Sequence, residues 1–140
     1  MPLFPNVVGV LEQSMKAANL RHQTIANNIA NVNVPGFIAS EVTFEEQLKE
    51  ALKGEAPDAG LQGLTADPRH IPIPPSTAPV RPVEPQVRPI VTGQMRQDGN
   101  TVDVETEQAK LAANQLWYQA LVRSVNDEFT RLRTAITGGR

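Results

Sequence analysis

The stretch ANNIANVNVPGF, residues 26–37, decides how the first part of the chain is built. It holds four asparagines within the seven positions 27–33, between apolar residues that keep a helical spacing. Asparagine is a poor helix former, because its side chain competes for nearby backbone groups. Pro35 and Gly36 are typical of the central pair of a type II turn. The stretch predicts a helix that ends near Asn33 in a left-handed conformation, followed by a reversal of the chain.

The remaining asparagines need a reason beyond capping. Asn27 and Asn31 are four residues apart and share one helix face, with Asn28 beside them. Each amide offers two donors and one acceptor. At a helix–helix junction such groups fix one register, as a buried polar residue does in a coiled coil. We therefore expect these three residues to lie at a junction between helices.

The sequence before this stretch has the spacing of a heptad seam. Its apolar positions are separated by four and three residues in turn, with His22 at the one missing position. These positions are Phe4, Val8, Leu11, Met15, Ala18, Ile25, Ile29 and Val32. Pro5 suits the first turn of a helix. We expect a long helix within residues 1–34, with His22 as a hydrogen-bonded interior residue.

A second seam occupies residues 103–140. Its apolar positions are Val104, Leu111, Tyr118, Val122, Val125, Phe129, Leu132 and Ile136, and Gln108 and Gln115 complete the alternation. Carboxylates at 103, 105 and 107 suit the positive end of a helix dipole, and the Gly138-Gly139 pair ends the pattern. A helix of this extent is about 50 Å long. We expect it to pair along its seam with the first helix.

The middle of the chain has a different character. Residues 35–56 predict the turn and then a short helix, with a start pattern at Thr43–Glu46 and Gly54 as its end. Residues 57–102 hold nine of the twelve prolines and should be extended. The turn signal Asp98-Gly99-Asn100 predicts a small β-hairpin between residues 87–91 and 95–102. The expected fold class is mainly α, a coiled-coil-like pair of long helices with these additions.

Composition excludes several classes of protein. The chain has 140 residues, a formal net charge of −2 and no cysteine. The absence of a basic balance argues against nucleic acid as a partner, and without cysteine there is no disulfide or thiolate metal site. No stretch approaches the roughly 20 apolar residues of a membrane span. The N-terminus lacks the features of a signal peptide, so export would use no cleaved leader. Aromatic residues are only 4%, which favours a core completed by neighbouring molecules.

Candidate catalytic residues are few. The two histidines, His22 and His70, have no carboxylate at the spacing of a zinc or nucleophile site. Glu45 and Glu46 are better explained as the start of the short helix than as an acid–base pair. We therefore expect no catalytic, cofactor or metal site and no cofactor. A small hydrolase remains a distant alternative, and a soluble coiled-coil adaptor that does not polymerise is a nearer one.

The opening stretch resembles the N-terminal signature of the flagellar axial proteins, the family of rod, hook and hook-associated subunits. The usual form is Ala-Asn-Asn-Ile-Ala-Asn, two variable residues, and Pro-Gly-Tyr or Pro-Gly-Phe, often followed by a basic residue. Val34 and Ile38 depart from it, at positions where threonine and a basic residue are common. The segments TADPRHI (65–71), DGNTVDVETEQAKLAANQLWYQALV (98–122) and RLRTAITGG (131–139) narrow the resemblance to the proximal rod proteins. Another rod subunit of the same family is the alternative.

The resemblance implies a structural subunit of the bacterial flagellar basal-body rod, in the periplasm, exported unfolded by the flagellar type III apparatus. Terminal helices of such subunits assemble into a tubular drive shaft around the export channel. The implied partners are further copies of the chain, the rod proteins FlgC, FlgF and FlgG, and FliE and the export-gate proteins at the rod base. We expect subunit contacts at Asn27, Asn28, Ile29, Asn31, Pro35, Gly36, Phe37, Leu111, Tyr118, Leu121, Val125, Phe129, Leu132 and Ile136.

Overall fold

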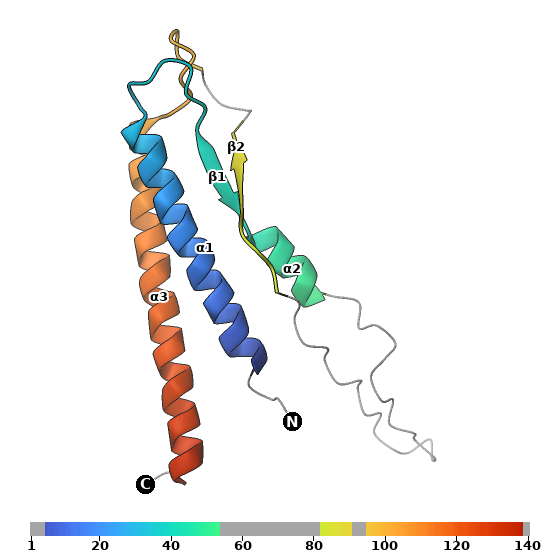
Figure 1. Ribbon diagram of the computed structural model, residues 1–140. Helices are drawn as coiled ribbons and strands as arrows, with labels where there is room; N and C mark the ends of the chain where they lie inside the picture. Colours follow the sequence, from blue (N-terminus) through green and yellow to red (C-terminus); the bar gives the residue numbers. More distant parts are fainter. Residues whose placement is uncertain (1–4, 54–81, 91–94, 139–140) are drawn as a thin grey trace, which may run out of the picture.

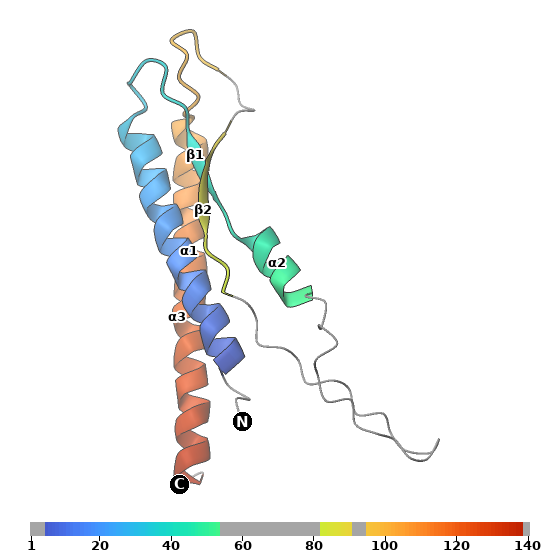
Figure 2. The same cartoon turned by 45° about the vertical axis from the view of Figure 1, so that its right-hand side comes forward.

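Two long helices lie side by side and define the molecule (Figure 1). The computed structural model describes residues 5–53, 82–90 and 95–138. Its elements are α1 (Pro5–Ala30), β1 (Ser40–Thr43), α2 (Glu45–Lys53), β2 (Gln86–Pro89) and α3 (Val104–Thr137). The two strands form a ribbon that runs along α1 and leads to α2, as Figure 2 also shows. The expected fold class, mainly α with paired terminal helices, is confirmed.

The helices α1 and α3 run antiparallel. The Asn28 amide contacts the Glu107 carboxylate, the Asn114 amide contacts the Ala18 carbonyl, and Val8 lies beside Val125. Higher residue numbers in one helix therefore meet lower numbers in the other. At about 1.5 Å per residue, α3 is about 12 Å longer than α1. Its C-terminal turns extend past the described part of α1 (Figure 1).

The face that α3 turns inward differs from the one expected. The buried residues of α3 are Glu107, Asn114, Leu121 and Glu128, which are seven residues apart. Half of the predicted seam is half-buried, namely Val104, Leu111, Val122, Val125 and Leu132. The other half is exposed, namely Gln108, Gln115, Tyr118, Phe129 and Ile136. Glu107 and Asn114 turn inward because each makes a hydrogen bond to α1. His22 is exposed, so its prediction as an interior residue was wrong.

The predicted β-hairpin was also wrong. Strand β2 pairs antiparallel with β1 instead, with Val42 opposite Val87 and Glu41 opposite Arg88. Residues 95–102 form a loop with a turn at 97–99. The loop is irregular because its backbone groups bond to the chain after α1: Thr101 N–H donates to the Phe37 carbonyl, and Gly36 N–H to the Asp98 carbonyl. These hydrogen bonds occupy backbone groups of the loop that a strand paired with β2 would need.

The ends of the helices follow local signals. Asp103 is the N-cap of α3 and accepts a bond from the Glu105 N–H, and Gly138 ends the helix in a left-handed conformation. The turn at Pro35 is confirmed, since Phe37 N–H donates to the Val34 carbonyl and Gly36 has φ +73°. Asn33 is not left-handed, because the positive φ angles among the described residues all belong to glycines.

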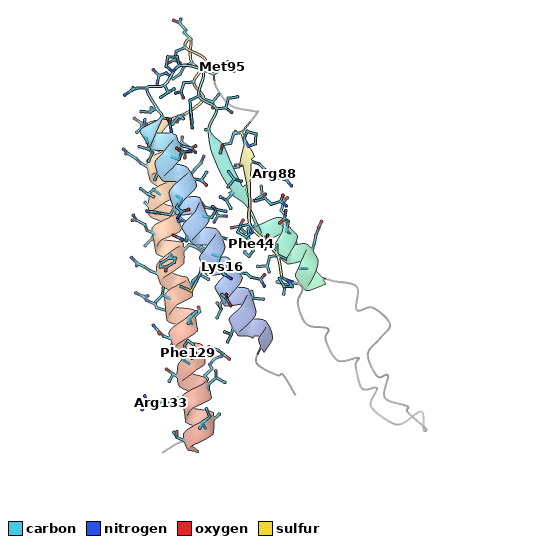
Figure 3. The ribbon with its side chains drawn as sticks, viewed as in Figure 1. Lys16, Phe44, Arg88, Met95, Phe129 and Arg133 are labelled. Atoms are coloured by element: carbon cyan, nitrogen blue, oxygen red, sulfur yellow. The ribbon has the colours of Figure 1, made fainter. Side chains whose placement is uncertain are left out.

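The short helix α2 and the core complete the fold. Helix α2 is present as predicted, although Thr43 belongs to β1 and the helix begins at Glu45. Phe44 is buried where the ribbon meets α2 (Figure 3). The buried apolar residues of the described chain are Ala17, Ala18, Ile25, Ala39, Val42, Phe44, Val102 and Leu121. Small side chains dominate this core, so polar contacts carry much of the specificity of packing.

Some expectations lie outside the described residues. They are Phe4 at the start of the first seam, Gly54 and Gly139 at helix ends, and most of the proline-rich segment with His70. The boundaries proposed for the four segments of the chain stay a prediction.

Candidate functional site

A single asparagine joins α1, β1 and α3. The Asn28 side chain is 0% exposed. Its Nδ2 donates to the Ser40 carbonyl at 2.8 Å and to Glu107 Oε2 at 2.9 Å, and its Oδ1 accepts from the Ser40 N–H at 3.0 Å. A primary amide presents a donor and an acceptor side by side, as a peptide group does. Asn28 thus pairs with the backbone of β1 along the edge that β2 leaves free.

The position of Ser40 in the ribbon explains why this edge is free. Ser40 lies opposite Pro89 in the register, and the neighbouring bond of the ladder runs from the Ile90 N–H to the Ala39 carbonyl. In an antiparallel pair, residues that bond to the opposite strand alternate with residues that do not. The backbone groups of Ser40 therefore point away from β2 and toward α1. Proline has no N–H to leave unpaired at this place. The ribbon therefore depends on α1 for the hydrogen bonds of its first residue.

Two further polar contacts set the position of α3 against α1. The second oxygen of Glu107 accepts from Lys110 Nζ at 2.6 Å, so its buried carboxylate has a cation and an amide as partners. About two helical turns further along, Asn114 Nδ2 donates to the Ala18 carbonyl at 2.9 Å. A buried polar pair of this kind specifies register, because a slip of the helices leaves its members unpaired.

A second asparagine holds the end of α1. Asn100 is fully buried, and its Nδ2 lies within hydrogen-bond distance of the carbonyls of Asn31, Val32 and Val34, at 3.0, 3.1 and 2.8 Å. Its Oδ1 accepts from the Val102 N–H at 2.7 Å. These carbonyls belong to the turn that follows Ala30, and those of Asn31 and Val32 also accept from the Val34 N–H and from Arg96. Because Asn100 lies just before α3, its bonds tie the two helices together at the same end of the molecule.

An apolar stripe runs along α3 at the border between its buried and its exposed sides. Its residues are Tyr118, Val122, Val125, Phe129, Leu132 and Ile136, separated by four and three residues in turn. Val122, Val125 and Leu132 are half-buried, whereas Phe129 is 59% and Ile136 84% exposed. Figure 3 shows Phe129 on the part of α3 near the C-terminus, beyond the ribbon. A sustained row of exposed apolar side chains marks a surface that contacts other molecules.

Comparison with known proteins identifies the family. A family model described as flagella basal body rod protein matches residues 10–37. The flagellar basal body rod protein FlgB of Bacillus subtilis (strain 168) is 32% identical over 142 residues, which cover 100% of both chains. FlgB of Proteus mirabilis (strain HI4320) is 33% identical, covering 91% of both chains. FlgB of Escherichia coli (strain K12) is 31% identical, covering 92% of this chain and 94% of its own.

The chain belongs to the FlgB family of flagellar basal body rod proteins. A structural role in the flagellar rod, at the basal body, follows from this membership. The matched residues 10–37 cover most of α1 and its exit turn, and so include Asn28 and Gly36. In this member of the FlgB family, the asparagine-rich stretch therefore forms the junction between the two long helices and the ribbon.

The contact residues expected for a FlgB-family subunit fall into three groups in the structure. Asn28 and Leu121 are buried within the chain. Half-buried are Ile29, Asn31, Phe37, Leu111, Val125 and Leu132. Exposed are Asn27, Pro35, Gly36, Tyr118, Phe129 and Ile136. Asn31 Nδ2 donates to the carbonyl and side-chain oxygens of Asn27, so this pair caps the end of α1. The role of all these residues in subunit contacts stays a prediction.

Sequence reasoning missed the partners of the buried amides. From the sequence alone, Glu107 fits a carboxylate at the start of a helix and Asn100 fits a turn, and no motif singles out Asn114. A signal was present: the polar residues Glu107, Asn114 and Glu128 share one heptad position. Polar side chains that recur at a single heptad position are candidates for register-setting contacts.

Charged groups elsewhere in the described chain support helices. The Thr106 hydroxyl donates to Asp103 and lowers the pKa of that carboxyl, and the backbone N–H groups of Glu105 and Thr106 also lower it. A hydrogen bond from Lys16 lowers the pKa of Glu12.

Within residues 5–53, 82–90 and 95–138, no helix is long and apolar enough to cross a membrane. In the same ranges, no three histidine or acidic residues gather in a way that could hold a metal ion.

Proposed function

We propose that this chain is a subunit of the proximal rod, which assembles through its paired helices into the tubular drive shaft around the flagellar export channel. The observation that carries the proposal is the apolar stripe on α3, which continues past the described end of α1. The chain acts by packing against neighbours, as a structural part and not as an enzyme.

Burial of the stripe supplies the driving force for assembly. Covering one large apolar side chain contributes about 1.5–3 kcal/mol. Phe129 and Ile136 are the most exposed members of the stripe, so neighbours that cover both would contribute about 3–6 kcal/mol at that contact. Association costs of similar size oppose this, so several such contacts per subunit are needed. A tubular lattice provides them, because each subunit has neighbours on more than one side.

The family membership supports particular partners and a place. We infer contacts with further copies of the chain, with the rod proteins FlgC, FlgF and FlgG, and with FliE and the export-gate proteins at the rod base. The rod lies in the periplasm, and the chain reaches it through the flagellar export apparatus. A small core suits this route, since a chain with few large buried side chains folds late, when neighbours complete it.

Electron microscopy of basal bodies from a strain that lacks the gene tests the proposal. We expect basal bodies without rods, and complementation by the full chain should restore them. Rods of normal length in that strain would instead favour an adaptor that binds the rod without building it.

A pair of variants tests the stripe itself. Phe129→Ser with Ile136→Ser should abolish rods while leaving the helix content of the purified chain unchanged. Leu116→Ser is the matched control, because Leu116 is also exposed but lies about 200° around α3 from Tyr118 of the stripe. Equal swimming in both strains would argue against the stripe as the assembly surface.

A further inference from the structure

Strand β2 forms the outer edge of the ribbon. It lies on the far side of β1 from α1 (Figure 1), and all four of its residues are exposed. Within the part of the chain that the structure describes, no third strand pairs with β2. An edge of this kind is a template for a strand of another molecule, because its outward N–H and C=O groups can pair with one. A two-stranded ribbon is only marginally stable, so a third strand would stabilise it.

The register shows which residues of β2 turn their backbone groups outward. The Ile90 N–H donates to the Ala39 carbonyl, so the backbone of Ile90 faces β1. Residues that bond to the opposite strand alternate with residues that do not. The backbone groups of residues 86 and 88 therefore face β1 as well. Those that point outward belong to the intervening positions, which are Pro85, Val87 and Pro89.

Two of the three outward positions are proline. Proline has no N–H, and its ring occupies the place of that hydrogen. A strand added at this edge would find one donor, the N–H of Val87, and its carbonyls opposite the prolines would lack a partner. The positions that face β1 are Gln86, Arg88 and Ile90, each of which keeps its N–H. The prolines thus interrupt the outer edge and leave the pairing within the ribbon intact.

We propose that Pro85 and Pro89 close the outer edge of the ribbon against the addition of a strand from another copy of the chain. Val87 between them is β-branched and 49% exposed, so without the prolines this edge would favour strand pairing. On the other edge, the Asn28 amide already pairs with the backbone of Ser40. The closure acts in the free chain as well as in an assembly, so it does not depend on the proposed function.

Opening the edge tests the proposal. Pro85→Val with Pro89→Val restores an N–H at both outward positions. Self-association of the purified full chain, measured by sedimentation velocity, should strengthen about tenfold or more, the effect expected from two further hydrogen bonds. Infrared spectra should show added intermolecular β-sheet. Pro82→Val is the matched control, because Pro82 is also exposed but lies outside the paired strand. Unchanged association in the double variant, or an equal rise in the control, would overturn the proposal.

A third substitution separates edge pairing from misfolding. Val87→Pro, added to the double variant, removes the N–H at the centre of the reopened edge. Association through the edge should then return to the level of the unmodified chain, whereas association through an unfolded state would persist. Circular dichroism of the unmodified chain and both variants follows their helix content. Association that persists in the triple variant would show that the edge is not its cause.

The inner and outer positions of β2 can also be compared directly. Val87→Pro in the unmodified chain removes an outward N–H, so the urea midpoint should hardly change. Arg88→Pro removes an N–H that faces β1, so the midpoint should fall. The two substitutions lie on adjacent residues of one exposed strand, which makes each the control for the other. Equal shifts of the midpoint would contradict the assignment of inner and outer positions, and the closure of the edge with it.

Discussion

Replacement of Asn28 should unfold the junction of α1, β1 and α3. Asn28→Ala removes two hydrogen bonds to the backbone of Ser40 and one to the Glu107 carboxylate. It leaves those groups buried, and Ser40 has no other edge to pair with on that side. The structure predicts a local defect with consequences for all three elements.

The magnitude follows from these bonds. Each neutral bond contributes about 1 kcal/mol net, and the bond to the carboxylate about 1.5–3 kcal/mol. Alanine is the better helix former, which offsets about 0.5 kcal/mol. The free energy of unfolding should therefore fall by about 3–4.5 kcal/mol, a large part of the roughly 5–15 kcal/mol typical of a domain. With a urea slope of about 2 kcal/mol per molar, the midpoint falls by about 1.5–2.3 M.

Urea unfolding followed by circular dichroism at 222 nm measures this change. The small core makes an osmolyte such as trimethylamine oxide useful, because it strengthens burial and provides a folded baseline. Asn27→Ala is the matched control: the adjacent asparagine is exposed and bonds only within the end of α1, so its replacement should change stability by less than about 0.5 kcal/mol. Equal midpoints for the two variants would refute the reasoning that the buried amide holds the junction.

Three other predictions concern the backbone and pH. Asn100→Ala should lower stability by about 2–4 kcal/mol, because the carbonyls of the turn after α1 lose the Asn100 amide as a donor and the Val102 N–H loses its acceptor. Hydrogen exchange should then accelerate in that turn and not at the C-terminus of α3. Gly99→Ala should lower the free energy of unfolding in urea by about 1–2 kcal/mol, since φ is +78° and the added Cβ lies 3.4 Å from Gly36 Cα. Gly9→Ala should instead stabilise α1 by about 0.5–1 kcal/mol, since nothing lies within 4 Å of its added Cβ. A change of the same sign for both variants would contradict this. Because the pKa of Asp103 is lowered, its cap stabilises α3 fully above the ordinary pKa of about 3.9, and this contribution is lost as pH falls through the lowered value. Asp103→Asn caps the helix without titrating, so it should remove that part of the acid dependence of stability measured by circular dichroism. An unchanged pH profile in the variant would count against this prediction.

Local signals account for the parts of the fold that were predicted correctly. The start of α3 at Asp103, its end at Gly138 and the turn at Pro35-Gly36 each depend on a few adjacent residues whose conformational preferences are strong. The pairing of the terminal helices followed from two seams with the same spacing. The resemblance of residues 26–37 and 98–122 to rod proteins was likewise visible in the sequence, and the comparisons confirmed the family.

Partners distant in the chain account for the parts that were wrong. The seam of α3 was placed on its apolar stripe, but Glu107 and Asn114 face α1 because they bond to groups 79 and 96 positions away. A helix whose heptads carry one apolar row and one polar row can turn either row toward its partner helix. The periodicity of the sequence alone does not decide between the two arrangements. The strand partner of Val87 was misassigned for the same reason, because the loop near Gly99 was already bonded to residues 36–39.

By itself the sequence determined that the chain has two long terminal helices, where α3 begins and ends, and that the chain belongs with the rod proteins, because helix propensity, caps and turn residues act over a few positions. Only the tertiary structure decided which side of α3 meets α1, and so which apolar residues remain for neighbours. A buried amide or carboxylate must find its hydrogen-bond partner somewhere in the folded chain, and meeting that requirement turns the polar row inward and leaves Phe129 and Ile136 of the apolar stripe exposed.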